Sequence, residues 1–234
     1  TGKIRRLIDA PVGSPSQQRC GLCRQGPPCY PVTPMIVSHE LKLIFIGIPR
    51  TGTLTVRQIL DAYTAHPLLP QHQNFSLPMG HAERVDHATA RDLRAHLGEQ
   101  VWRDYFKFTI VRNPWDRVAS WFNCDYFRRQ GIGFEDWLVG GGLGNPDYSI
   151  NHIAPAALWL LDEQGRLAVD FVGRYESYRQ DLLYALERVG IRLQDIPHLN
   201  ASRKSDYRDL YNARTRDIVA NYYAEDIARF GYSY

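Results

Sequence analysis

The chain has 234 residues, of which 44% are hydrophobic and 23% are charged, and this fits one globular domain with a full core better than two domains. Its 28 Lys and Arg residues face 25 Asp and Glu residues, for a formal net charge of +3, so no broad electrostatic surface for nucleic acid is expected. No run of about 18 apolar residues occurs, and no basic segment leads into an apolar one at the start, so we expect neither a membrane span nor a signal peptide in these residues.

The first 40 residues are rich in Pro, Gly, Ser and Gln and lack a sustained hydrophobic period, which predicts an irregular arm before a domain over residues 41–234. Three cysteines, Cys20, Cys23 and Cys29, lie in this arm, and Cys124 is the fourth. A single CxxC pair without an obvious fourth ligand favours free or disulfide-bonded cysteines over zinc. No metal site is therefore expected.

A strand, a loop and a helix follow the arm. The run LKLIFIGI, from Leu41 to Ile48, is apolar apart from Lys42, which predicts a strand buried on both faces. After the loop PRTGT, apolar residues recur with the period of one helix face, at Val56, Ile59, Leu60 and Tyr63.

Two further strand and helix units follow. The segment FKFTIV predicts a strand over residues 106–111, and AVDFVGRY predicts another over residues 168–175. Asn113 suits a helix N-cap and Pro114 the first helical position, so Arg112 is expected at the carboxyl end of its strand. The helix faces are predicted at Trp115, Val118, Ala119, Phe122 and Tyr126, at Leu182, Ala185, Leu186 and Val189, and in a closing helix at Val219, Tyr222, Tyr223, Ile227 and Phe230.

The alternation of strands and helices predicts an α/β fold, a single domain with a central parallel sheet flanked by helices. In such sheets ligands bind beyond the carboxyl ends of the strands, where both PRTGT and Arg112 are expected. Gly52 lets the backbone approach an anion, and the following helix adds free N–H groups and the positive end of its dipole. Hydroxyls are offered by Thr51, Thr53 and Thr55.

This loop is expected to hold a phosphate, and a tight turn with a solvated Arg50 is the alternative. The Walker pattern GxxxxGK[ST] is absent, which disfavours a nucleotide kinase or another P-loop NTPase. Arg112 can contact two phosphate oxygens with its planar fork, and Ser120, two helical turns later, adds a neutral donor.

The segments FIGIPRTGTLT and FTIVRNPWDRVASWF resemble the 5'-phosphosulfate loop and the 3'-phosphate segment of sulfotransferases that use 3'-phosphoadenosine 5'-phosphosulfate (PAPS). The branch of carbohydrate (family 2 type) sulfotransferases is most similar, and VGRYESYRQDLLYALERVGI and SRKSDYRDLYN extend the resemblance over residues 41–234. It implies a P-loop-like nucleotide-binding core, with PAPS as donor and PAP as product. The implied donor-binding residues are Arg50, Thr51, Gly52, Thr53, Leu54, Thr55, Arg112, Ser120, Tyr175 near the adenosine, and Arg203 and Lys204 over the 3'-phosphate.

Two residues depart from the pattern of that family. Arg50 stands where lysine is usual, and Leu54 stands where a small or hydroxylated residue is common. Arginine can stabilise a charged leaving group, but it does not readily give up a proton. A PAP-binding or glycan-binding module without turnover is therefore the alternative to an enzyme.

His87 is the candidate base for the acceptor proton. Asp86 is predicted to cap a helix that stops at Gly98, which places His87 in the first turn, where the positive helix end keeps the imidazole neutral. The stretch DHATARDLR is also similar to the family segment that supplies the acceptor-side histidine. Further candidates are His81, Glu83, Asp125 and Glu176. Arg50 and His87 would serve a direct in-line displacement without a metal.

The acceptor is not specified by any motif. The branch implies a carbohydrate hydroxyl, while peptides, lipids and small metabolites stay open. The lack of a leader favours a cytoplasmic enzyme of bacterial type, and the lumen of the Golgi is the alternative if the chain is a domain trimmed from a longer eukaryotic protein.

Overall fold

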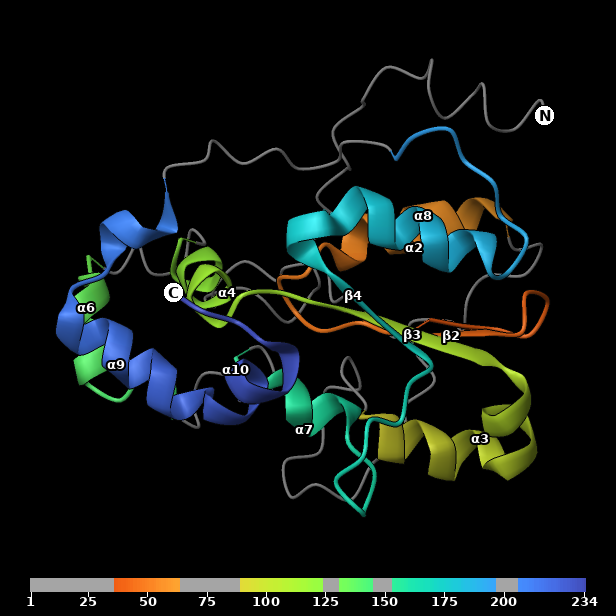
Figure 1. Cartoon of the computed structure of the whole chain (residues 1–234), viewed down its shortest axis with the longest axis horizontal. Coiled ribbons are helices and arrows are strands. Elements are labelled where there is room, and N and C mark those ends of the chain that lie inside the picture. The colour runs from red at the N-terminus through yellow and green to blue at the C-terminus, as the bar shows by residue number, and fades with distance from the viewer. Residues whose placement is uncertain (1–35, 64–88, 124–130, 145–152, 197–205) are drawn as a thin grey trace, which may run out of the picture.

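The computed structural model describes residues 36–63, 89–123, 131–144, 153–196 and 206–234 (Figure 1). All four cysteines, and the arm up to residue 35, lie outside these ranges. The strands are β1 (Ile36–Ser38), β2 (Leu43–Ile46), β3 (Phe106–Val111) and β4 (Phe171–Arg174). The α-helices are α2 (Thr53–Tyr63), α3 (Ala90–Asp104), α4 (Pro114–Phe122), α6 (Phe134–Val139), α7 (Ala156–Leu160), α8 (Tyr178–Glu187), α9 (Ala213–Tyr222) and α10 (Ala224–Phe230), and the 3₁₀ turns are η2 (Tyr175–Ser177) and η3 (Tyr207–Leu210).

Within the described ranges the four strands form one sheet in the order β1-β2-β3-β4. Strands β2, β3 and β4 are parallel, with Phe45 opposite Phe108 and Phe108 opposite Phe171, so the predicted parallel core is confirmed. Strand β1 pairs antiparallel with β2 and lies where an irregular arm was predicted. Ile36 and Val37 are buried there. A strand of three residues is too short to show a hydrophobic period, so the sequence pattern did not predict it.

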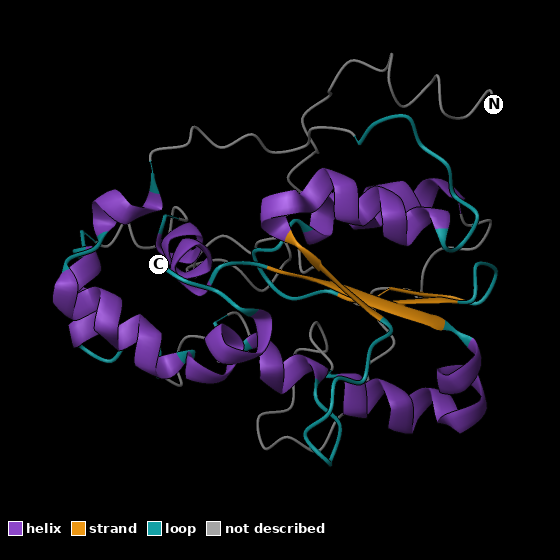
Figure 2. Cartoon of the chain, in the orientation of Figure 1, coloured by secondary structure: helices purple, strands orange, loops and turns teal. Residues whose placement is uncertain are grey.

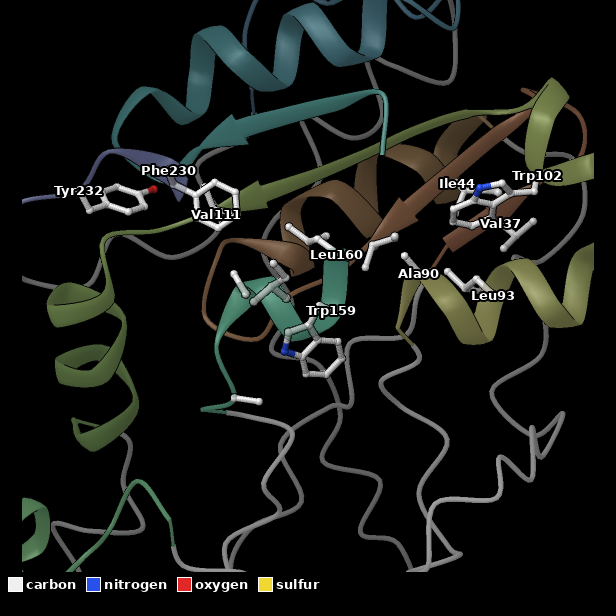
Figure 3. Close-up of a cluster of buried hydrophobic side chains, with 14 residues drawn as sticks. Val37, Ile44, Ala90, Leu93, Trp102, Val111, Trp159, Leu160, Phe230 and Tyr232 are labelled. Atoms are coloured by element: carbon white, nitrogen blue, oxygen red, sulfur yellow. The ribbon is translucent and has the colours of Figure 1, made fainter. Parts of the chain in front are cut away.

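Helices cover both faces of the sheet (Figure 2). Successive residues of a strand point to opposite sides, so an apolar strand such as β2 packs against both layers of helices. Ile44 and Ile46 pack on one face with Leu93 of α3 and Leu160 of α7 (Figure 3). On the other face, Leu43, Phe45 and Phe108 pack with α2 and α8. The predicted helix faces of α2 and α8 are buried at Val56, Ile59, Leu60, Leu182, Ala185 and Leu186.

A third apolar cluster lies beyond the carboxyl end of β3. It joins α4, α6 and α9 through Trp115, Phe122, Trp137 and Val219, and these helices gather on one side of the molecule in Figure 1. The cluster supports the helix that follows Arg112. Asn113 caps this helix, accepting a hydrogen bond from the Trp115 N–H, and Pro114 is its first residue, as the sequence predicted.

The start of α3 corrects one prediction. Its N-cap is Thr89, not Asp86: the Thr89 side chain and Asp92 form a capping box that satisfies the first free N–H groups of the helix. His87 therefore precedes the helix in the sequence and is not in its first turn. The predicted stop at Gly98 is confirmed, because its dihedral angles of 81° and 159° are not helical; a second helical segment then continues α3 to Asp104.

One continuous closing helix was predicted for residues 213–230, and this prediction is wrong. The segment is divided into α9 and α10 at Tyr223, which has non-helical dihedral angles of −105° and 25°. The Tyr223 hydroxyl donates to the Ile153 carbonyl. The Asp226 carboxylate accepts the N–H groups of Ala156 and Ala157, at 2.6 Å and 2.8 Å. The break lets both side chains reach residues 153–157, a tertiary constraint that no apolar period reveals.

We expect Asp226→Asn to change how stability depends on pH. Asp226 is 3% exposed, and burial raises the pKa of its carboxyl, against the opposing effect of its bonds to Ala157 and Ala156. A pKa raised in the folded state makes the free energy of unfolding fall as pH rises, starting near the ordinary value of 3.8. The stability of the parent relative to the uncharged variant should therefore decline as the pH rises above 3.8 in urea unfolding curves. A difference that grows with pH would contradict the assignment.

Candidate functional site

The loops after β2 and β3 meet at one edge of the sheet, because the two strands are parallel neighbours. Nη1 of Arg112 donates to the Arg50 carbonyl at 2.9 Å. The Arg50 guanidinium donates to the Ser120 hydroxyl, at 3.2 Å from Nε and 3.1 Å from Nη2, and to the Ser120 carbonyl at 2.8 Å. The structure thus brings together three side chains, Arg50, Arg112 and Ser120, that are up to 70 residues apart.

The Arg50 loop, residues 49–53, has an unusual backbone. Arg50 has a φ of 70° and Gly52 a φ of 84°. Arg50 has a Cβ and yet lies in the left-handed region, which costs of order 1 kcal/mol of conformational free energy. Arg117, only 3% exposed, donates to the Pro49 carbonyl at 3.1 Å. Together with Arg112, which donates to the Arg50 carbonyl, it supports the strained loop.

Main-chain N–H groups of this loop are available to a ligand. Within the described residues, no acceptor lies in hydrogen-bond range of the N–H groups of Gly52, Thr53 and Leu54, whereas the Thr55 N–H bonds to the Gly52 carbonyl at 3.1 Å. They begin α2, where unpaired N–H groups and the helix dipole favour an anion. The loop therefore offers three main-chain donors to an anion.

The threonine hydroxyls are directed into the protein. Thr51 donates to the Ile48 carbonyl at 2.8 Å and is fully buried, and the Thr55 side chain interacts with the Tyr178 hydroxyl. Thr53 is buried as well, while Leu54 is 36% exposed. The loop thus presents its backbone rather than the hydroxyls of Thr51 and Thr55.

Arg112 is held on three sides. Asp116 accepts from Nε and Nη2, at 2.7 Å and 2.8 Å, Nη1 bonds to the Arg50 carbonyl, and the Tyr175 ring centroid lies 4.1 Å from the guanidinium carbon. The described residues engage three of the five N–H groups of this guanidinium, so two are left for an anion. Asp116 was missed in the sequence, although its i, i+4 spacing from Arg112 was a usable signal.

The segment Tyr175–Tyr178 contacts both loops. One oxygen of Glu176 accepts the Asn113 N–H at 2.7 Å, and the other accepts the Tyr232 hydroxyl at 3.3 Å, which favours a structural role for Glu176 over that of a base. The Tyr178 hydroxyl donates to the Gly52 carbonyl at 2.6 Å. Tyr178 was missed because it fits the apolar period of α8 and carries no motif.

Several predicted residues lie outside the described parts of the chain. They are His87 and its alternatives His81, Glu83 and Asp125, and the loop residues Arg203 and Lys204. In the described parts, no group of three or more His, Cys, Asp or Glu side chains could hold a metal ion. Within the same ranges no helix has the length and the apolar character needed to cross a bilayer.

We expect Arg50→Gly to be more stable than Arg50→Ala by about 1 kcal/mol, because only glycine relieves the left-handed backbone while both variants lose the guanidinium. Urea unfolding of the two variants measures the difference. Arg57, inside α2, is the control: there the order should reverse, since alanine is favoured in a helix by about 1 kcal/mol. An alanine variant at Arg50 as stable as the glycine variant would argue against the left-handed conformation.

Comparison with known proteins gives the family of the chain. The sequence profile described as the sulfotransferase family matches residues 33–233. An uncharacterized protein of Archaeoglobus fulgidus is 23% identical over 127 residues, which cover 50% of this chain and 95% of that protein. No solved structure matches the chain. Since the matched region spans the sheet, both loops and the closing helices, the chain belongs to the sulfotransferase family, in its carbohydrate (family 2) branch.

Proposed function

We propose that this protein transfers the sulfuryl group of PAPS to an acceptor hydroxyl and releases PAP. The observation that carries the proposal is the contact between the loops after β2 and β3, in which Arg112 donates to the Arg50 carbonyl and Arg50 donates to Ser120. PAPS carries an anionic group at each end of its ribose. Two guanidinium groups from neighbouring strand ends match such a ligand.

The Arg50 loop would bind the 5'-phosphosulfate in a P-loop-like core. The N–H groups of Gly52, Thr53 and Leu54, which have no acceptor among the described residues, would donate to its oxygens. Thr51 and Thr55 would shape the loop, since their side chains bond within the protein. Arg50 supplies the positive charge beside these donors.

The 3'-phosphate would lie at Arg112 and Ser120. Arg112 keeps two N–H groups for it, and Ser120, whose oxygen accepts from Arg50, can still donate its own proton. Tyr175, now stacked on Arg112, is proposed to border the adenosine. Arg203 and Lys204 are proposed to close over the phosphate, on the basis of the family resemblance.

The reaction would be a direct displacement. The acceptor oxygen forms a bond to sulfur while the bond from sulfur to the bridging phosphate oxygen breaks, so PAP leaves with the electron pair. Arg50 and the loop N–H groups stabilise the charge that develops on that oxygen. His87 is proposed to take the acceptor proton. No covalent enzyme intermediate is needed.

A carbohydrate is the proposed acceptor class, because the family profile is that of the carbohydrate branch. A cytoplasmic location of bacterial type is proposed, with the Golgi lumen as the alternative. A binding module without turnover would show the same loops, so measured transfer from labelled PAPS to a panel of glycans separates the two.

We expect PAP and PAPS to raise the melting temperature more than ATP with magnesium does, because the Arg112 site fits a 3'-phosphate, which ATP lacks. Thermal melts at matched nucleotide concentrations test this, together with transfer of labelled sulfate. Equal shifts with PAP and ATP would count against the donor assignment. A shift with PAPS but no transfer to any acceptor would favour the binding module.

We expect Arg112→Ala to weaken PAP by about 10²-fold, close to 3 kcal/mol, and AMP by less than about 3-fold. Calorimetric titration of both nucleotides measures the loss. The substitution leaves Asp116 without its partner, so Arg112→Ala/Asp116→Asn separates lost attraction from new repulsion. Arg94→Ala, on an exposed ion pair of α3, is the control. Equal losses for PAP and AMP would remove Arg112 from the 3'-phosphate site.

A further inference from the structure

Tyr178, the first residue of α8, lies directly against the backbone of the Arg50 loop. A Cβ placed on Gly52 would come within 2.6 Å of the Tyr178 ring and 2.9 Å of its hydroxyl. These distances are well below van der Waals contact. Glycine is therefore needed at position 52 both for its φ of 84° and for the approach of Tyr178.

The Tyr178 hydroxyl is fixed by a hydrogen bond to the loop, because it donates to the Gly52 carbonyl at 2.6 Å. Burial raises the pKa of Tyr178 well above its usual range, and the Thr55 side chain opposes this only in part. The phenol therefore stays protonated and remains a donor across the physiological pH range.

The bond to Gly52 sets the direction of a neighbouring donor. In a trans peptide the C=O and the following N–H point in opposite directions. Because the Gly52 carbonyl is turned toward Tyr178, the Thr53 N–H points away from Tyr178 and α8. This N–H is one of the three loop donors without an acceptor among the described residues.

We propose that Tyr178 is a positioning residue for sulfuryl transfer, an inference that rests on the function proposed above. Through the Gly52 carbonyl it holds the Thr53 N–H toward the 5'-phosphosulfate of the donor. Its segment also contacts the second loop, since Tyr175 stacks on Arg112 and Glu176 accepts the Asn113 N–H. One short segment thus aligns the two ends of the nucleotide site.

The test is Tyr178→Phe, which keeps the ring and removes only the hydroxyl. Single-turnover transfer from PAPS should slow by about 10-fold, while PAP affinity falls by less than about 3-fold, because a donor to the leaving oxygen acts more strongly as charge develops. Tyr211→Phe is the matched control. It loses a comparable bond, from a partly buried phenol to the Trp115 carbonyl at 2.8 Å, and should lose stability without a slower transfer.

A second measurement does not depend on turnover. In the parent, the amide resonance of Thr53 should move when PAP is added, and it should move less in Tyr178→Phe but normally in Tyr211→Phe. A parent that neither binds PAP nor transfers sulfate overturns the proposed function. An active parent whose Tyr178→Phe variant has the parent rate, or loses rate and PAP affinity by the same factor, overturns only the role of Tyr178.

Discussion

The parallel pairing of β2 with β3 is the constraint on which the site depends. It puts the ends of both strands at one edge of the sheet, so the Arg50 carbonyl comes within 2.9 Å of Arg112. An antiparallel pairing would place the two loops at opposite edges. The register is fixed by burial on both faces, since a shift of one residue would exchange the side chains of β2 that face α3 and α7 with those that face α2 and α8.

Three guanidinium groups gather around the Arg50 loop, and their positive charges have partners within the protein. Arg112 pairs with Asp116 and stacks on Tyr175, while Arg117 donates to the carbonyls of Pro49 and Ala154. Buried charges are tolerated only with such partners. The same guanidinium groups hold the carbonyls of Pro49 and Arg50 and so support the loop.

The elements that support the site come from distant parts of the chain. Segment Tyr175–Tyr178 holds the two loops, and the helices of the closing segment pack on α4 and reach α7 through Asp226. These contacts use hydroxyl, carboxylate and main-chain groups rather than apolar periods. These contacts stabilise the left-handed backbone of Arg50, because a strained backbone persists only where the surrounding structure supports it.

The sequence by itself determined the local features. Apolar runs and periods predicted β2, β3, α2, α4 and α8, and Asn113 with Pro114 located Arg112, because strand burial, helix faces and caps depend on residues close in the chain. The structure moved the N-cap of α3 from Asp86 to Thr89, through a capping box with Asp92 that is local in the chain. Only the tertiary structure decided the break at Tyr223 and the role of Tyr178, because each hydroxyl reaches a main-chain carbonyl that packing alone brings near.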